Sequence, residues 1–275
     1  MTEMRYEQLP DGGKIPVLGL GTWNMGGGMR ANFDKDTEII EIIQNAIQLG
    51  FTHIDTAEIY GNGHTEELVG QAIKGFERRH LFITTKVSAS NLKYQDVWFA
   101  LEGSLKRLGT DYIDLYLIHW LNHQIPLEET FRALNEVVAR GMVHYLGVSN
   151  FDLEHLKKAQ ELSATPIVTN QVPYSLKDRS YDSNGVLRYC QETSCLLTAY
   201  SPLKGGVLSS SVVRRIAQQY GATPAQVALS WLIRQPKVIT IPKSAKTKRL
   251  QENLGALDLH LAKEDLEKLD KLSSV

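Results

Sequence analysis

The sequence lacks the features that would place a protein outside the cytoplasm. Its 275 residues include only two cysteines, Cys190 and Cys195. In a chain of this length we expect them to be reduced packing residues, although a disulfide or a redox role stays open. No run of 18 apolar residues is present to span a bilayer, and the N-terminal residues lack the apolar core of a signal peptide. These absences together predict a cytoplasmic protein.

Charge of neither sign is in excess. Lys and Arg number 30 and Asp and Glu number 31, which gives a formal net charge of −1 at pH 7. We therefore expect neither nucleic acid nor an anionic membrane as a partner. With 43% hydrophobic and 22% charged residues, the composition is that of a globular protein long enough to bury a large core. We expect a monomer that acts on a small molecule.

Apolar runs alternate with amphipathic stretches along the chain. The eight strand-like runs are Val17–Gly21, Thr52–Thr56, Leu81–Val87, Tyr112–His119, Val143–Ser149, Ile167–Val172, Leu196–Ser201 and Val238–Pro242. Most lack clean alternation of apolar and polar residues, as expected of parallel strands covered on both faces. Helical patterns lie between them, at Thr37–Leu49, Glu66–Ile73, Asp96–Leu108, Glu128–Ala139, Leu153–Glu161 and Asn184–Glu192. This order favours an α/β fold of the (β/α)₈ TIM barrel type over a doubly wound sheet.

Additional segments fit such a barrel. The stretch from Tyr6 to Pro16 has the pattern of a β-hairpin that turns at Asp11-Gly12-Gly13, placed to cap the bottom of the barrel. Leu203–Lys237 holds two helical patterns and so an extra helix, and Thr223-Pro-Ala-Gln226 has the residues of a helix start. No linker, low-complexity tract or repeat is present, which predicts a single barrel domain over residues 1–275.

Residues whose side chains can take part in catalysis gather where the predicted strands end. Asp55 lies at the end of one run and Tyr60 just past it, Lys86 lies near the end of the next run, and His119 ends the fourth. Barrel active sites lie at these strand ends. An ammonium beside a phenol lowers its pKa from about 10, and such a tyrosine can donate a proton to a carbonyl oxygen while hydride reaches the carbon. Each residue alone has an ordinary structural explanation, but the set predicts carbonyl chemistry.

Several segments resemble those of one enzyme family. Gly50-Phe-Thr-His-Ile-Asp-Thr-Ala-Glu-Ile-Tyr-Gly61 resembles the first signature of the aldo-keto reductases, and blocks similar to its later ones follow in order at Ile118–Trp120, Gly147–Asn150, Ala199–Leu203 and Ile241–Ser244. The resemblance implies a catalytic tetrad of Asp55, Tyr60, Lys86 and His119. In that tetrad Tyr60 is the proton donor, Lys86 lowers its pKa, Asp55 holds Lys86, and His119 orients the substrate carbonyl.

Hydride transfer requires a cofactor, because no side chain carries hydride. Gly19-Leu-Gly21 is not followed by the rest of a G-x-G-x-x-G fingerprint, which argues against a Rossmann site. The resemblance implies NADP(H) extended across the barrel top instead. The contacts implied are Thr22, Trp23, Ser149, Asn150, Gln171, Tyr200, Ser201, Leu203, Ile241, Lys243, Ser244, Arg249, Glu252 and Asn253. Judged singly, Tyr200 could equally be a core residue and Asn150 a helix cap.

A basic segment follows the last predicted strand. Lys243-Ser-Ala-Lys-Thr-Lys-Arg249 holds four cations in seven residues at a strand-to-helix junction, where free backbone N–H groups favour an anion. The resemblance implies that Lys243, Ser244 and Arg249 contact the 2′-phosphate of NADP. It also implies that Glu252 and Asn253 contact the adenine. A solvated basic surface is the structural alternative.

The predicted activity is NADPH-dependent reduction of aldehydes and ketones to alcohols, with Trp23 and Trp120 lining the substrate pocket. A metal at His119 and His123 is not expected, since no third ligand has suitable spacing. Two alternatives remain. One is a non-catalytic, cofactor-binding, redox-sensing subunit of the same fold, and the other is a barrel aldolase that uses Lys86 as a Schiff base.

Overall fold

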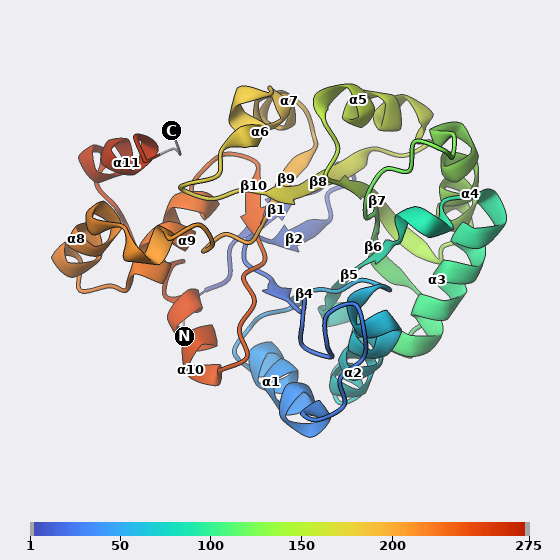
Figure 1. The fold of residues 1–275 in the computed structure, drawn as a ribbon, viewed down its shortest axis with the longest axis horizontal. Coiled ribbons are helices and arrows are strands. Elements are labelled where there is room, and N and C mark those ends of the chain that lie inside the picture. The colour runs from blue at the N-terminus through green and yellow to red at the C-terminus, as the bar shows by residue number, and fades with distance from the viewer. Residues whose placement is uncertain (1–2, 273–275) are drawn as a thin grey trace.

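Eight parallel strands form one sheet in which chain neighbours are also spatial neighbours (Figure 1). The computed structural model describes residues 3–272. In chain order the strands are β3 (Leu20–Gly21), β4 (His53–Asp55), β5 (Phe82–Val87), β6 (Ile113–Ile118), β7 (Val143–Ser149), β8 (Ile167–Pro173), β9 (Leu196–Tyr200) and β10 (Val238–Thr240). They occupy the predicted runs, and their central residues are buried, as expected of strands covered on both faces.

The first and last strands close the sheet on itself. Leu18 and Thr240 form a parallel bridge. The Gly19 amide donates to the Thr240 carbonyl at 2.8 Å, and the Thr240 amide donates to the Val17 carbonyl at 2.9 Å. A side chain at Gly21 would lie 2.6 Å from the Ile241 carbonyl oxygen, so this seam requires glycine. The predicted (β/α)₈ barrel is thereby confirmed.

Helices surround the barrel. They are α1 (Asp36–Gln48), α2 (His64–Ile73), α3 (Tyr94–Leu108), α4 (Leu127–Ala139), α5 (Leu153–Leu162), α6 (Ser180–Ser183), α7 (Val186–Glu192), α8 (Ser211–Gln219), α9 (Pro224–Ile233), α10 (Thr247–Leu254) and α11 (Lys263–Asp270). All but α6 and α11, which we did not predict, correspond to predicted helical segments. The apolar face of α1 is buried, as its spacing predicts. Thr223 and Gln226 form a reciprocal capping box at the start of α9, also as predicted. Within residues 3–272, none of the helices is long and apolar enough to cross a membrane.

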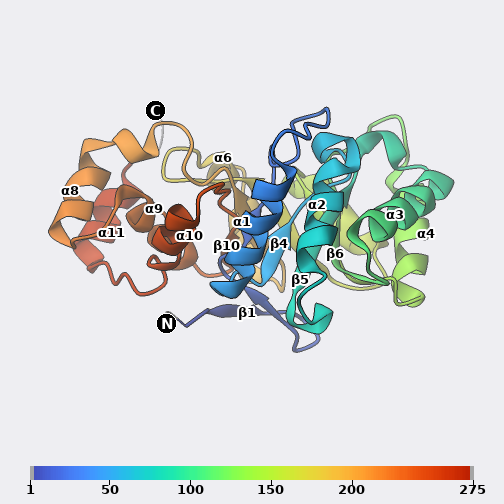
Figure 2. The same cartoon turned by 90° about the horizontal axis from the view of Figure 1, so that it is seen from below.

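The additions to the barrel lie where the sequence predicts them. Strands β1 (Tyr6–Gln8) and β2 (Lys14–Pro16) pair antiparallel, and in Figure 2 this hairpin lies below the barrel, while the dark blue loop between β3 and α1 rises on the other side. The hydroxyl of Tyr145, from the start of β7, donates to Asp11 in the hairpin turn at 2.8 Å. Helices α8 and α9 both precede β10, and α11 packs against α8. The hairpin thus covers one end of the barrel and leaves the strand carboxyl ends to the loops.

Candidate active site

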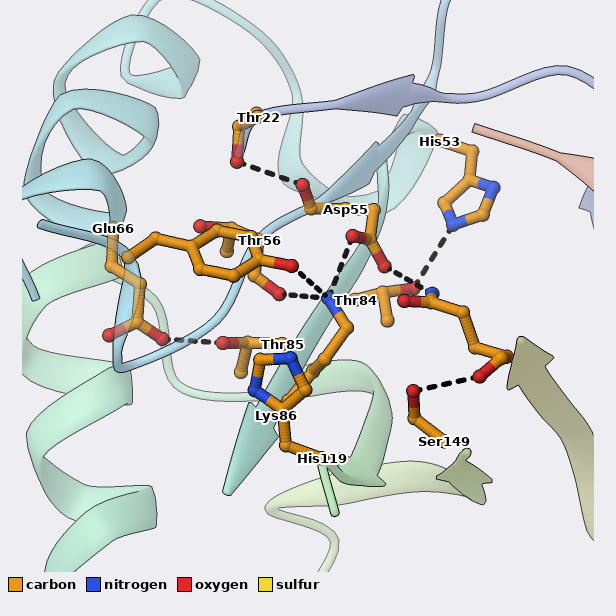
Figure 3. A network of polar contacts seen from close by, with 12 residues as sticks. Thr22, His53, Asp55, Thr56, Glu66, Thr84, Thr85, Lys86, His119 and Ser149 are labelled. Atoms are coloured by element: carbon orange, nitrogen blue, oxygen red, sulfur yellow. Dashed lines mark hydrogen bonds and ion pairs between the residues drawn. The ribbon is translucent and has the colours of Figure 1, made fainter. Parts of the chain in front are cut away.

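The four predicted catalytic residues converge at the carboxyl ends of β4, β5 and β6. Asp55 ends β4, Lys86 lies in β5, and His119 directly follows β6. Tyr60 opens a 3₁₀ turn, η1 (Tyr60–Gly63), that leads into α2. The Lys86 Nζ donates to Asp55 Oδ1 at 2.7 Å, to the Thr56 carbonyl at 2.7 Å and to the Tyr60 hydroxyl at 3.4 Å. Figure 3 shows the ammonium at the centre of these contacts.

Lys86 is fully buried, yet its charge is compensated. Burial lowers the pKa of the ammonium, but attraction to Asp55 and Tyr60 outweighs burial and leaves the pKa above its ordinary value. The second carboxylate oxygen of Asp55 accepts a 2.7 Å hydrogen bond from the Gln171 side chain. Both Asp55 oxygens and all three Lys86 protons therefore have partners, as a buried ion pair requires. The arrangement holds a positive charge 3.4 Å from a phenol oxygen.

The phenol of Tyr60 does not have the lowered pKa that we expected. Burial raises its pKa, the Lys86 ammonium lowers it, and the Asp55 carboxylate raises it, with a net shift above the ordinary value. Lys86 acts in the expected direction, but the expectation of a net decrease is wrong because burial outweighs it. Tyr60 is therefore protonated at neutral pH, which is the form that can donate a proton.

The turn that carries Tyr60 has an unusual backbone. Gly61, Asn62 and Gly63 have φ values of 58°, 53° and 93°, and a left-handed conformation costs a non-glycine residue such as Asn62 on the order of 1 kcal/mol. The Gly61 amide donates to the Gly28 carbonyl at 2.6 Å. This hydrogen bond ties the turn to the loop between β3 and α1, the loop that also contains Trp23.

His119 is a neutral imidazole in this site. Its ring lies 5.7 Å from the ring of Tyr60, measured between centroids. Burial and the nearby Lys86 charge lower its pKa to about 3. The buried Nδ1 has no hydrogen-bond partner in the protein. Because His119 also lines the cavity described below, its neutral ring is suited to orienting a polar ligand group rather than to carrying charge.

Most of the predicted contacts line one cavity of about 650 Å³, a volume within the range of ligand sites. The predicted residues that line it are Trp23, Trp120, Ser149, Asn150, Gln171, Tyr200, Ser201, Leu203, Ile241 and Lys243, together with Asp55, Tyr60 and His119. Asn24, Met29 and Lys204 also line the cavity, although we did not predict them. Asn24 and Met29 lie in the loop of Gly26–Gly28, where no motif indicates their role; Lys204 directly follows the predicted contact Leu203.

The predicted amide contacts are already bonded to one another. The Ser149 hydroxyl donates to the Gln171 carbonyl at 2.8 Å, and the Asn150 amide donates to that hydroxyl at 2.9 Å and to the His119 carbonyl at 3.1 Å. The Tyr200 hydroxyl donates to the Asn150 side-chain oxygen at 2.9 Å. This network fixes the cavity wall. Separately, the side-chain nitrogen of Gln171 donates to Asp55, a partner that we did not predict.

Five predicted cofactor residues do not line the cavity. Thr22 is buried and its hydroxyl donates to the Asp55 carbonyl at 2.8 Å, so it joins β3 to β4. Ser244 donates to the Lys246 carbonyl at 3.1 Å. Arg249 is exposed on the first turn of α10, and that first turn holds no acidic residue. The other two, Glu252 and Asn253, lie further along the same helix.

The position of Lys86 bears on the aldolase alternative. Lys86 has no exposed surface and is absent from the cavity wall, and its Nζ is held by three acceptors. A Schiff-base lysine must reach the substrate carbonyl as a neutral amine. The geometry therefore disfavours the aldolase. Among residues 3–272, no group of three or more His, Cys, Asp or Glu side chains could hold a metal ion.

The lowered pKa of His119 predicts a pH-dependent stability. Because an unfolded histidine has a pKa of about 6.5 and folded His119 one of about 3, the unfolded chain binds more protons between these values. Stability therefore falls as pH falls through this window. Between about pH 7.5 and about pH 5.5, the urea midpoint of the wild type should decrease more than that of His119→Gln. His80→Gln, at an exposed histidine, is the control and should keep the wild-type dependence. Equal dependence in all three proteins would contradict the assignment.

Known proteins are similar to this chain in sequence and in structure. A family model described as the aldo/keto reductase family matches residues 17–274. Methylglyoxal reductase YeaE of Escherichia coli is 37% identical over 264 residues, which cover 94% of this chain and 90% of that protein. Glyoxal reductase of Bacillus subtilis is 37% identical over 269 residues, which cover 97% and 92%.

Solved structures agree with these matches. The thermostable aldo-keto reductase Tm1743 has a TM-score of 0.95 and 47% identity, covering 98% of this chain and 100% of that one. An aldo-keto reductase from Klebsiella pneumoniae, in complex with NADPH, has a TM-score of 0.89 and 37% identity, and the match covers 98% of this chain and 95% of that one. With the family model spanning nearly all of its length, this chain belongs to the aldo/keto reductase family.

Proposed function

We propose that the protein is an NADPH-dependent oxidoreductase that reduces aldehydes and ketones to alcohols, with Tyr60 as the proton donor. The observation that carries this proposal is the fully buried Lys86, which joins Asp55 and the Tyr60 hydroxyl beside a cavity of about 650 Å³. Membership of the aldo/keto reductase family and similarity to a structure in complex with NADPH support the cofactor and the reaction.

The cavity suits a nicotinamide cofactor. When bound, NADP(H) would supply the hydride that no side chain carries. Tyr200, with a half-buried ring, would lie against the nicotinamide, and Ser149 and Asn150 would meet its carboxamide. Ile241 and Lys243 line the wall a few residues before α10, and Ser201 and Leu203 line it just after β9. At that helix start, the free N–H groups and the exposed Lys246, Lys248 and Arg249 favour an anion.

The residues of the tetrad divide the remaining tasks. Tyr60 donates its proton to the carbonyl oxygen as that oxygen gains negative charge, a role worth about 10²–10⁴-fold in rate. Lys86 stabilises the tyrosinate left behind, because its positive charge lies 3.4 Å away. Asp55 and the Thr56 carbonyl hold Lys86 in place. His119, neutral and part of the cavity wall, orients the substrate oxygen toward Tyr60.

The cavity mouth favours uncharged substrates with an apolar part. Trp23 and Trp120 are 42% and 50% exposed, and Met29 also lines the cavity. Two relatives are named for reduction of methylglyoxal and of glyoxal, so small dicarbonyls are the first compounds to test. A redox-sensing subunit would bind the cofactor without turnover, and no feature of the described residues favours it.

We also propose that residues 1–275 act as one domain, as a monomer and in the cytoplasm. A single family model covers residues 17–274, and the net charge is close to zero. Residues 1, 2 and 273–275 of this range lie outside the described residues. Sedimentation velocity at micromolar concentration should give one species near the chain mass of 30.9 kDa. A species of twice that mass would contradict the monomer.

Replacing Tyr60 with Phe should lower the rate of carbonyl reduction by about 10²–10⁴-fold, because the proton donor is removed. NADPH binding, measured by fluorescence titration, should change little. Tyr145→Phe, which removes a phenol at the opposite end of the barrel, serves as the matched control and should retain activity. If Tyr60→Phe kept more than about a tenth of the wild-type rate, Tyr60 would not be the donor.

Replacing Arg249 with Ala should weaken NADPH binding by about tenfold or more and leave NADH binding nearly unchanged. A hydrogen bond to a charged group contributes about 1.5–3 kcal/mol, and about 1.4 kcal/mol is tenfold in affinity. Lys248→Ala removes another exposed cation of α10 and should have a smaller effect, since an ammonium lacks the paired donors of a guanidinium. Both titrations belong at physiological salt. An equal loss for NADPH and NADH would show that Arg249 does not bind the 2′-phosphate.

A further inference from the structure

The turn that carries Tyr60 lies against a neighbouring helix as well as against the loop between β3 and α1. Within η1, Gly61, Asn62 and Gly63 are all left-handed, and none of their own hydrogen bonds is to the strand that carries Lys86. A side chain at Gly63 would lie 2.8 Å from Cδ and 2.9 Å from Nε of Arg107. The Arg107 side chain, from the last turn of α3, therefore rests directly against the backbone three residues after Tyr60.

Arg107 is itself held from several sides. Its Nε donates to Glu66 Oε2 at 2.7 Å, and its Nη2 donates to the Ser104 hydroxyl at 3.2 Å. A side chain at Gly103 would lie 2.9 Å from Nη1. The guanidinium thus occupies the space that two glycines, Gly63 and Gly103, leave open. Its side chain is 26% exposed, whereas that of Glu66 is completely buried.

Glu66 connects this contact to the strand of Lys86. Its second oxygen, Oε1, accepts a 2.5 Å hydrogen bond from the hydroxyl of Thr85, the residue directly before Lys86 in β5. Figure 3 shows Thr85 and Glu66 joined beside the contacts of Lys86. Successive residues of a strand point to opposite faces, so Thr85 meets the helices while Lys86 faces the barrel interior. The carboxylate therefore joins α2, β5 and α3 at one point.

We propose that Arg107 is a positioning residue for Tyr60. Its contact with Gly63 sets the position of the turn. Its ion pair with Glu66, which is bonded to Thr85, fixes that position relative to β5, the strand that carries Lys86. The 3.4 Å separation of the Tyr60 hydroxyl and Lys86 Nζ is thereby defined from outside the barrel. Arg107 does not line the cavity and acts only through Tyr60. This inference rests on the proposed role of Tyr60 as proton donor.

The test compares two arginines with similar ion pairs at opposite ends of β5. Arg107→Gln removes the cation beside Glu66, and Arg107→Lys keeps a charge but loses the planar group that spans Gly63 and Ser104. The matched control is Arg78→Gln. Arg78 is 19% exposed and bonds Asp114, near the amino ends of β5 and β6 and away from Tyr60. Both glutamine variants are expected to lower the urea midpoint, because each leaves a carboxylate without its partner.

The kinetic outcome separates positioning from stability. Because a shift of about 1 Å in a reacting group can cost about 10²-fold, Arg107→Gln should lower kcat by about 10- to 100-fold while KM for NADPH changes less than about twofold. The kcat of Arg107→Lys should lie between that of Arg107→Gln and that of the wild type, whereas Arg78→Gln should keep the wild-type kcat. The proposal is overturned if Arg107→Gln and Arg78→Gln lower the midpoint alike and have the same kcat.

A measurement without substrate or cofactor tests the same contact. Hydrogen exchange, followed by mass spectrometry on the peptide that contains Tyr60 to Gly63, should be faster in Arg107→Gln and Arg107→Lys than in the wild type and in Arg78→Gln. Unchanged exchange in both Arg107 variants would mean that Arg107 does not hold the turn. If the wild type reduced no carbonyl compound, the proposed function would fail, and this exchange result alone would decide whether Arg107 fixes the position of Tyr60.

Discussion

The ion pair between Lys86 and Asp55 is the contact on which the site depends. Both side chains are buried, and removing one partner of such a pair costs about 3–5 kcal/mol because the other charge remains. The acceptors of Lys86 come from the end of β4 and from the turn that follows it, and the second oxygen of Asp55 is bonded by Gln171 from β8. The buried charge of Lys86 is therefore tolerated only if the barrel brings the end of β4, the turn after it and β8 close together.

The closed barrel meets this requirement by its geometry. Asp55 and Gln171 are 116 positions apart in the chain, yet their side chains meet at 2.7 Å because both follow parallel strands to the same end of the barrel. The network from Ser149 through Asn150 to Tyr200 extends around that end. The side chains of the cavity wall are thus held in place by hydrogen bonds to one another.

Sequence patterns predict the scaffold better than the contacts inside it. The eight strands, the hairpin and the capping box of α9 follow from local patterns. The four residues of the predicted tetrad lie among polar residues at strand ends, and the family resemblance is what singles them out. The bond from Gln171 to Asp55 crosses the barrel, so no local pattern indicates it. The net rise in the pKa of Tyr60 depends on how completely its phenol is covered, and Thr22 proved to bond a neighbouring strand. Such outcomes depend on three-dimensional packing, which the sequence does not display residue by residue.

The enclosure of Lys86 also protects it from the compounds that the family handles. Aldehydes and dicarbonyls modify amines that are both neutral and accessible. A surface lysine is accessible, and a small fraction of its molecules is neutral at any moment. The Lys86 ammonium has no exposed surface, and its raised pKa leaves almost none of it in the reactive neutral form. The amine at the centre of the site is therefore shielded from carbonyl compounds in the surrounding solution.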